Sequence, residues 1–205
     1  AGAVDGGVFM LASLAAYAVG SMMIFSFGIG LASDRAARLD QLYRASPLPP
    51  AVYLASRLLM AVLFALLVLL LLFTFATLVG GVRLSPLTWI AVISRLVLGS
   101  VPFAALGFAI GYAASPQAAS GVANLIYLPL SLGSGLFVPL PALPPLVQQV
   151  APILPTYHYG QLAWGAVGAP SEDPAVSAAW LAGYAVLFLA IAVRWYRVEE
   201  QRKFG

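Results

Sequence analysis

A cluster of charged residues lies between the first two long apolar stretches, and its spacing could form a docking surface. In a helix from Asp34 to Ala45, opposite charges would stand four positions apart, which stabilises a helix modestly. The charged members are Asp34, Arg35, Arg38, Asp40 and Arg44. Another face would be apolar and would carry Leu39, Leu42 and Tyr43. We therefore expect a short amphipathic helix along the membrane surface, ended by Pro47, Pro49 and Pro50.

Two roles fit such a helix. It could anchor to anionic lipid through its basic side chains, and periodicity alone favours this interpretation. It could instead be the docking element for a soluble partner, with the leucines seated on that partner or on the bases of the spans. Other features of the chain are needed to choose between the two roles.

The second unusual segment, Gly135 to Tyr159, is apolar enough for a membrane but too rich in proline to cross it. Seven of the fifteen prolines lie between Pro129 and Pro155. Each proline inside a helix removes a backbone donor and clashes with the preceding turn, at about 3 kcal/mol. Irregular backbone at membrane depth persists only where protein or a water-filled cavity shields it from lipid. We expect a broken hairpin at one membrane face.

Within this hairpin, Pro145 to Ala151 is predicted to form one short helix. Leu146, Val147 and Val150 would face apolar surroundings. Gln148 and Gln149 would face water or a partner. The hairpin could simply seal the top of the bundle, or it could open and close a pathway, and the two roles are compatible.

Other side chains suggest no catalytic chemistry. The sequence contains no G-x-x-x-x-G-K-[ST], H-E-x-x-H, G-x-S-x-G or S-x-x-K motif. It has one histidine and no cysteine, so no metal or cofactor site is expected in this chain. His158 is expected to pack at the membrane boundary. Arg95 is expected to extend from its helix to the outer interface.

The elements that carry these segments are membrane spans. Only 8% of the 205 residues are charged and the mean hydropathy is +0.97, whereas soluble domains hold roughly 25% charged residues. We expect an all-α, polytopic membrane helix bundle that forms a single domain over residues 1–205. Five spans of the required length are Val8 to Ala32, Tyr53 to Val79, Leu87 to Ala113, Gln117 to Val138, and Ala175 to Tyr196.

Local signals refine these spans. Ser85-Pro86, Ser115-Pro116 and Asp173-Pro174 place a capping side chain before a proline at the first helical position. Pro102 and Pro129 should kink their spans, and neighbouring helices must satisfy the freed carbonyls. Gly107-x-x-x-Gly111 permits close approach of another helix, within the chain or between copies.

The basic residues suggest an orientation. Eight of the ten lie in the connection after the first span or in the C-terminal tail, which marks that side as cytoplasmic. Residue 1 would then lie outside and the C-terminus inside. We therefore expect a further span before residue 1, making six, and a multi-pass protein of the cell membrane. Nucleic-acid binding is not expected, because orientation explains the positive charge.

The two unusual segments together resemble the permease subunits of type-2 ATP-binding-cassette (ABC) exporters. In that family a cytoplasmic segment ending in a Ser-Pro-Leu-like turn follows the second span, as LDQLYRASPL does here. The fifth span ends in a Ser-Gly-apolar-Phe-x-Pro run, and an outer re-entrant hairpin with a Leu-Pro-Pro turn follows. The matching residues are Ser134, Gly135, Leu136, Phe137, Pro139, Leu143, Pro144, Pro145, Pro152, Pro155, Thr156 and Tyr157.

The resemblance covers Val8 to Arg197. One departure is the sequence SDRAARLDQL, in which only Asp34 and Arg35 preserve part of the family's acidic-basic-acidic cluster. The resemblance implies a permease that works as a homo- or heterodimer in membrane lipid, with separate ATPase subunits that bind ATP and Mg²⁺. The helix from Asp34 to Ala45 would couple to the ATPase.

The outer hairpin would be the gate of the pathway. Its predicted residues are Phe137, Pro139, Pro144, Pro145, Gln148, Pro155 and Tyr157. An apolar lining favours lipidic or amphipathic cargo, as in multidrug efflux or glycolipid export, over small ions. The main alternative is an ion- or proton-coupled secondary transporter, which would place broken helices and ionisable groups near the bilayer midplane. A membrane scaffold is a third alternative, and it would need neither special segment.

Overall fold

The computed structural model describes residues 5–39 and 50–204, and these residues form helices without a strand. Four helical stretches among them are long and apolar enough to cross a membrane. They are α1 (Gly6–Ala36), α3 (Pro50–Leu78), the consecutive pair α4 (Pro86–Gly99) and α5 (Val101–Ala113), and α9 (Pro174–Phe204). The predicted all-helical membrane bundle is confirmed.

The fourth predicted span, from Gln117 to Val138, ends earlier than expected. Helix α6 (Pro116–Gly133) stops before Ser134, and the chain turns at Gly135 with a φ of 89°. This left-handed conformation favours glycine, because a Cβ would be strained there. α6 is therefore shorter than the predicted span, and it is not among the four spanning stretches.

Side-chain caps begin three of the helices, as predicted. Ser85 and Ser115 each accept a hydrogen bond from the backbone N–H three residues on, at 3.2 and 3.4 Å. Asp173 accepts from the N–H two residues on, at 2.8 Å. A proline stands at the first position of each helix, where its missing N–H has no intrahelical partner to lose.

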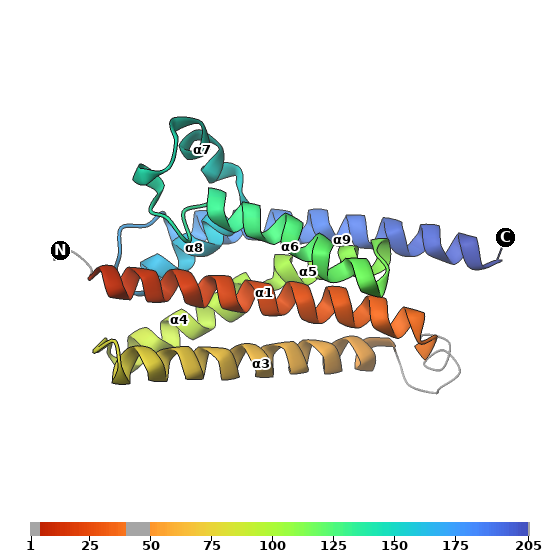
Figure 1. Cartoon of the computed structure of the whole chain (residues 1–205), viewed down its shortest axis with the longest axis horizontal. Helices are drawn as coiled ribbons and strands as arrows, with labels where there is room; N and C mark the ends of the chain where they lie inside the picture. Colours follow the sequence, from red (N-terminus) through yellow and green to blue (C-terminus); the bar gives the residue numbers. More distant parts are fainter. Residues whose placement is uncertain (1–4, 40–49, 205) are drawn as a thin grey trace.

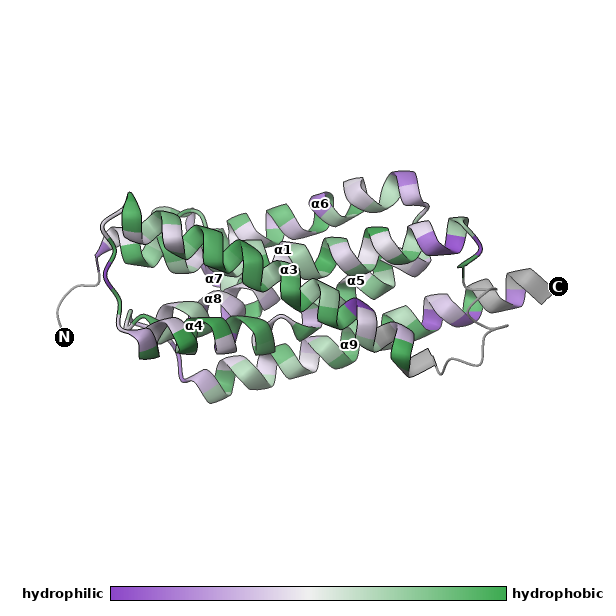
Figure 2. Ribbon diagram, turned by 90° about the horizontal axis from the view of Figure 1, so that it is seen from below, coloured by the Kyte–Doolittle hydropathy of each residue, from purple (hydrophilic) through white to green (hydrophobic). Residues whose placement is uncertain are grey.

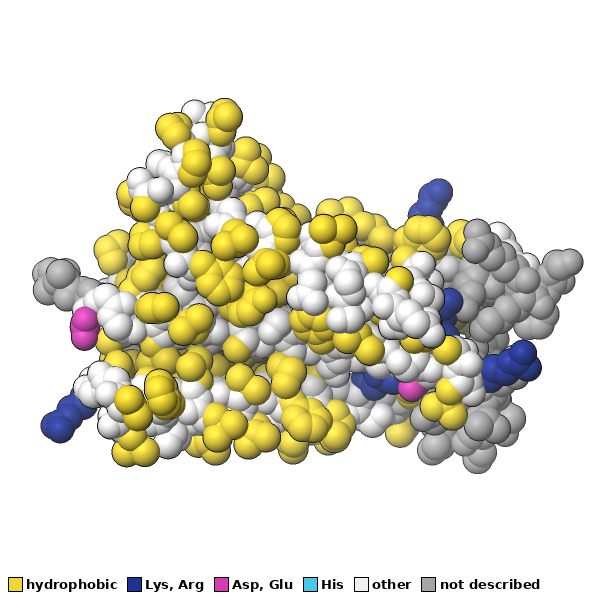
Figure 3. All heavy atoms as spheres, viewed as in Figure 1, with side chains coloured by type: hydrophobic (Ala, Val, Ile, Leu, Met, Phe, Trp, Pro, Cys, Tyr) yellow, Lys and Arg dark blue, Asp and Glu magenta, His cyan; other side chains and the backbone are white. Residues whose placement is uncertain are grey.

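The long helices lie roughly along one axis, so the molecule has two distinct ends (Figure 1). One end holds the N-terminus and the connection from α6 to α8 (Pro155–Ala166), and we call it the hairpin end. The opposite end holds the C-terminus and the ends of α1 and α3 that face each other. Hydrophobic residues run along the bundle between hydrophilic ends (Figure 2). Most visible basic side chains gather at the C-terminal end (Figure 3).

Glycines bring α1 and α5 into close contact at the centre of the bundle. A Cβ added at Gly107 would lie 2.8 Å from the carbonyl oxygen of Ile24, and one added at Gly111 would lie 2.9 Å from Cβ of Leu31. A Cβ at Gly28 of α1 would lie 3.4 Å from the Gly107 carbonyl oxygen. The predicted Gly-x-x-x-Gly contact therefore joins two helices within this chain.

A cluster of aromatic side chains extends this core toward the hairpin end. Its neighbouring rings have centroids 4.7 to 5.5 Å apart, in stacked, tilted and edge-on geometries. Its members come from α1, α5, α6, α8 and the chain after α6, and they are Tyr17, Phe103, Tyr127, Tyr159 and Phe137. The Tyr127 hydroxyl also donates to the backbone carbonyl of Tyr17 at 3.1 Å. The core thus links the spans to the hairpin.

The α1–α5 contact gives the first prediction. Gly107→Ala should lower the free energy of unfolding by about 1–3 kcal/mol, because the new methyl group must push α1 away. The measurement is the denaturation midpoint of the purified protein in detergent.

Gly121→Ala in α6 is the matched control, since a Cβ there would meet no atom within 4 Å. It should be neutral or stabilising by up to about 1 kcal/mol. Equal midpoints for the two variants would contradict a tight α1–α5 contact.

Candidate coupling and gate elements

A charged cluster joins the C-terminal end of α1 to the start of α3. The Arg57 guanidinium forms an ion pair with Asp34, and its Nε donates to the Tyr53 hydroxyl at 2.7 Å. The Tyr53 hydroxyl donates to Asp34 Oδ2 at 2.7 Å, and Arg57 Nη1 donates to the Ser26 carbonyl oxygen at 3.2 Å. Gly30 leaves room for the guanidinium, which a Cβ would strike. We call Asp34, Tyr53 and Arg57 the charged clamp.

Arg35 joins the same end of α1 to the end of α5. Its Nη1 donates to the backbone carbonyl oxygen of Gly111, and its guanidinium carbon lies 5.7 Å from the ring centre of Tyr112. Gly111 is in the last turn of α5, where carbonyls have no partner within the helix and attract a cation. With the charged clamp, this contact fixes α1, α3 and α5 together.

The predicted docking helix does not start at Asp34, which corrects the sequence analysis. Asp34 and Arg35 belong to the last turn of α1, and Arg38 has a φ of 54°, which interrupts the helix. Asp34 pairs with Arg57 across two helices, and not with Arg38 along one. Leu39 is helical and half-buried. The other predicted docking residues lie outside the described part of the chain: Asp40, Leu42, Tyr43 and Arg44.

At the hairpin end, the chain between α6 and α8 is a series of short pieces. After the turn at Gly135 come a 3-10 turn (Leu140–Ala142), α7 (Pro145–Val150) and a second 3-10 turn (Ala151–Ile153). In each piece a proline occupies one of the first two positions, because a proline there loses no helical hydrogen bond. The proline-broken helical hairpin is as predicted.

The predicted gate residues occupy two places. Phe137, Pro139, Pro144 and Pro145 lie in the hairpin, and the ring of Phe137 packs edge-on against Tyr17 of α1 at 4.7 Å. Gln148 also lies in the hairpin, in α7, whereas Pro155 and Tyr157 lie buried in the first turn of α8. The hairpin therefore has a free tip and a base that is held by the bundle.

Gln148 faces the interior of the hairpin, whereas the sequence analysis placed it toward water or a partner. Its amide Nε2 donates to the carbonyl oxygen of Leu143 at 2.7 Å and to that of Pro141 at 3.4 Å. Several N–H groups are missing in this proline-rich turn, so a side chain supplies donors to its carbonyls. Leu146 and Val150 are 76% and 50% exposed on this chain, where lipid or another protein could cover them.

Helix α8 is buried on every side at the base of the hairpin. All residues from Pro155 to Trp164 are buried, as in a helix at the centre of a larger core. The Thr156 hydroxyl donates to the Leu130 carbonyl oxygen of α6 at 2.7 Å. The Trp164 indole N–H donates to the Ser13 hydroxyl of α1 at 2.8 Å. Side chains of α8 thus hold the surrounding spans together.

Tyr159 of α8 satisfies a backbone carbonyl that is freed where α4 meets α5. The Ser100 N–H bonds to Val97, so the Leu96 carbonyl lacks its usual helical partner. The Tyr159 hydroxyl donates to that carbonyl at 2.8 Å, and both groups are buried. A neighbouring helix thus compensates for the break at Ser100, two residues before Pro102.

A polar cluster joins α8 to the connection before α9. His158 Nδ1 lies 3.2 Å from Glu172 Oε2, and His158 Nε2 lies 2.9 Å from the Pro152 carbonyl oxygen. Gln161 accepts a hydrogen bond from the Glu172 N–H at 2.9 Å. Burial, and then the nearby Glu172 carboxylate, raise the pKa of Tyr157. His158 is therefore part of a connected polar cluster rather than a packing residue at the boundary.

Arg95 turns into the protein, whereas the sequence analysis extended it to the interface. Its Nη1 is buried and has no hydrogen-bond partner in the described part of the chain. A Cβ at Gly165, near the end of α8, would lie 3.3 Å from this nitrogen. The negative end of the α8 dipole favours a cation at this place.

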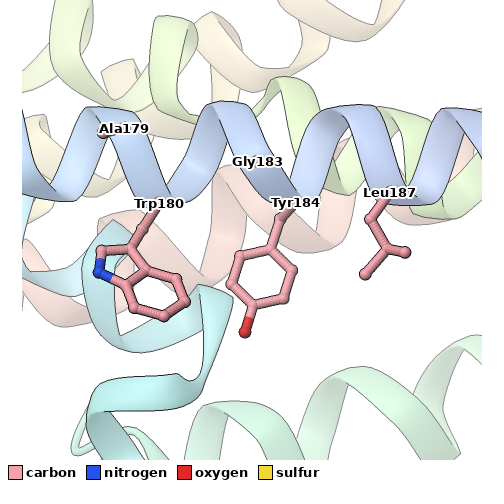
Figure 4. A pocket seen from close by; sticks show the side chains of 5 residues that line it. All are labelled: Ala179, Trp180, Gly183, Tyr184 and Leu187. Carbon is pink, nitrogen blue, oxygen red and sulfur yellow. The ribbon is translucent and has the colours of Figure 1, made fainter.

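A groove of about 510 Å³ runs along α9 beside the base of the hairpin (Figure 4). The ring of Trp180 stacks on that of His158 at 5.0 Å, and the Tyr184 hydroxyl donates to the Ile153 carbonyl oxygen. The groove is mostly apolar and is lined by Ala179, Trp180, Gly183, Tyr184 and Leu187. α9 thus contacts α8 and the 3-10 turn that ends the hairpin through its aromatic side chains.

The contacts of Tyr53, Arg57 and Tyr159 were not predicted from the sequence. Tyr53 and Arg57 stand four positions apart at the start of α3, and Gly30 and Asp34 stand four apart at the end of α1. These matched spacings could have located the charged clamp. Tyr159 offered no comparable signal, because its partner is a backbone carbonyl.

A double-mutant cycle tests the charged clamp. Asp34→Asn and Arg57→Gln should each lower the stability of the purified protein, because each leaves a partly buried charge without its partner. The interaction free energy between the two substitutions should be about 1–3 kcal/mol. A coupling of zero in detergent denaturation would contradict the ion pair.

The chain is similar to known proteins over a region that includes both the charged clamp and the hairpin. The sequence pattern of the family described as "ABC-2 family transporter protein" matches residues 3–194. A protein of Bacillus subtilis (strain 168) named "Putative transport permease YvfS" is similar, with 29% identity over 192 residues that cover 93% of this chain and 77% of that protein. The matched region includes the charged clamp, the hairpin and α8. This chain therefore belongs to the ABC-2 family of transporters, as a multi-pass membrane permease.

Proposed function

We propose that this permease forms the translocation pathway of an ATP-driven exporter and couples to separate ATPase subunits. Two permease copies, identical or different, would enclose the pathway, and the partner subunits would bind ATP and Mg²⁺. The observation that carries the proposal is the pair of polar clusters at opposite ends of one bundle. The charged clamp stands at the end of α1 and the start of α3, and the polar cluster of His158 and Glu172 stands at the base of the hairpin.

The charged clamp is suited to receive movement from an ATPase. It joins the last turn of α1 to the first turns of α3, and Arg35 adds the end of α5. A force on the segment between α1 and α3 would therefore act on three spans together. The amphipathic pattern of Leu39, Leu42 and Tyr43 supports docking of the ATPase on this segment.

One face of α6 supports a pathway beside this helix. Gln117, Gly121 and Asn124 are exposed at spacings that place them along one side of α6. Exposed amide side chains are costly against lipid tails, so such a face is more stable against water, cargo or the second permease copy. Together with apolar neighbours such as Leu125 and Leu128, it suits lipidic or amphipathic cargo better than small ions.

The positive-inside rule supports placing the charged clamp and the C-terminus in the cytoplasm. The hairpin would then lie on the outer face of the cell membrane, where it would gate the exit. Its exposed Leu146 and Val150 would meet lipid or the hairpin of the second copy.

A substitution in the docking segment tests coupling. Leu42→Asp should leave membrane insertion intact but lower cargo-stimulated, vanadate-sensitive ATPase activity of the copurified complex at least about tenfold, as for the loss of an interface hot spot. Gln41→Asp is the matched control, because position 41 lies opposite the leucine face of the predicted helix. Normal export by the Leu42→Asp variant would contradict docking at this segment.

A disulfide bond tests movement of the hairpin. The chain has no cysteine, so Leu146→Cys introduces a single thiol at an exposed position of α7. Oxidative cross-linking between two copies should stop export, and a reducing agent should restore it. Undiminished export by the cross-linked pair would mean that the hairpin is a static seal.

A further inference from the structure

The imidazole of His158 lies between two hydrogen-bond acceptors. Its side chain is 2% exposed, Nδ1 faces the Glu172 carboxylate at 3.2 Å, and Nε2 faces the Pro152 carbonyl oxygen at 2.9 Å. A neutral imidazole carries one N–H and can donate to one of them only. Both contacts are satisfied together when the His158–Glu172 pair holds one more proton, on the ring or on the carboxyl group.

The two acceptors belong to different parts of the fold. Pro152 is in the 3-10 turn that ends the hairpin, Glu172 precedes α9, and His158 itself is on α8. The stacked Trp180 ring holds the imidazole plane in place from α9. The proton on this pair therefore determines whether the hairpin base is bonded to α8 and α9 at the same time.

The neighbouring titratable groups are few. Tyr157 interacts with Glu172 from α8, and Tyr184 of α9 stacks on Trp180 and donates to the hairpin. The guanidinium of Arg95 packs by Gly165. Gly165 comes seven residues after His158 in α8, which corresponds to a rise of about 10 Å along the helix. Among the described residues, Glu172 is the one charged partner within hydrogen-bond distance of His158.

We propose that His158 and Glu172 form a proton-dependent latch that holds the base of the hairpin. With the extra proton, the ring bridges Pro152 and Glu172 and the hairpin is fixed. Without it, one of these bonds is lost and the hairpin moves more freely. The latch deepens the proposed function, because it would make the exit gate sensitive to the pH on the hairpin side of the membrane.

A spin label on the hairpin tests the latch directly. Gln149→Cys places a single label on the exposed side of α7, and the spectrum of the purified protein in lipid nanodiscs is recorded from pH 5 to pH 9. The ratio of mobile to immobile label should rise about tenfold with pH, as for one hydrogen bond of about 1.4 kcal/mol. A label at Leu146→Cys provides a second site on the hairpin. A label at Arg83→Cys, outside the hairpin, is the control.

Two substitutions should make the mobility of the hairpin label independent of pH, in opposite directions. In Glu172→Gln the amide N–H₂ can donate to Nδ1 while a neutral ring donates from Nε2 to Pro152, so the label should stay immobile throughout. In His158→Phe the stack on Trp180 is kept and both hydrogen bonds are lost, so the label should be mobile throughout. Elution as a single folded species checks each variant.

The possible results test the proposed latch and the proposed gate independently. An unchanged spectrum at both hairpin sites across the pH range, or a Glu172→Gln variant that responds like the parent, would overturn the latch. A pH-dependent spectrum combined with normal export by both variants would support the latch and overturn the proposed role of the hairpin as a gate.

Discussion

Every backbone carbonyl that a broken helix frees inside a membrane must find a donor within the protein, because hydrocarbon supplies none. This chain breaks its helices at Ser100 and again after Gly133. At the first break the donor comes from α8, which is buried from Pro155 to Trp164, since Tyr159 donates to the freed carbonyl of Leu96. Thr156 of α8 adds a hydrogen bond to the Leu130 carbonyl near the end of α6, which also accepts from the Ser134 N–H. The irregular hairpin end is stable because α8 lies inside it.

The same constraint explains why the hairpin is divided into a free tip and a held base. Its tip satisfies its own carbonyls through Gln148, whereas its base depends on α8 and α9 through His158 and Tyr184. The tip needs few contacts with the bundle. Movement of the hairpin would therefore break bonds at the base, where side chains can change partners without exposing backbone from a span.

Sequence patterns within a single helix predicted the fold well. Contacts between side chains of different helices were harder to predict from the sequence. The spans, the proline caps and the Gly107-x-x-x-Gly111 contact follow from local composition and spacing. The ion pair of Asp34 with Arg57, the inward turn of Gln148 and the buried Nη1 of Arg95 depend on which elements lie side by side. The predicted fourth span was too long because apolar composition continues past Gly133, whereas the helix ends at that residue and the chain turns at the left-handed Gly135.

α5 links the contact of Arg35 at the C-terminal end of the bundle to the break at Ser100. At one end its last turn receives the guanidinium of Arg35, and at the other it begins at the break beside Tyr159. The helix is 13 residues long, or about 20 Å, and its glycines press it against α1. A close-packed contact of this kind transmits displacement rather than absorbing it. A shift of α1 and α5 at the charged clamp would therefore be felt at α8, the helix on which the hairpin rests.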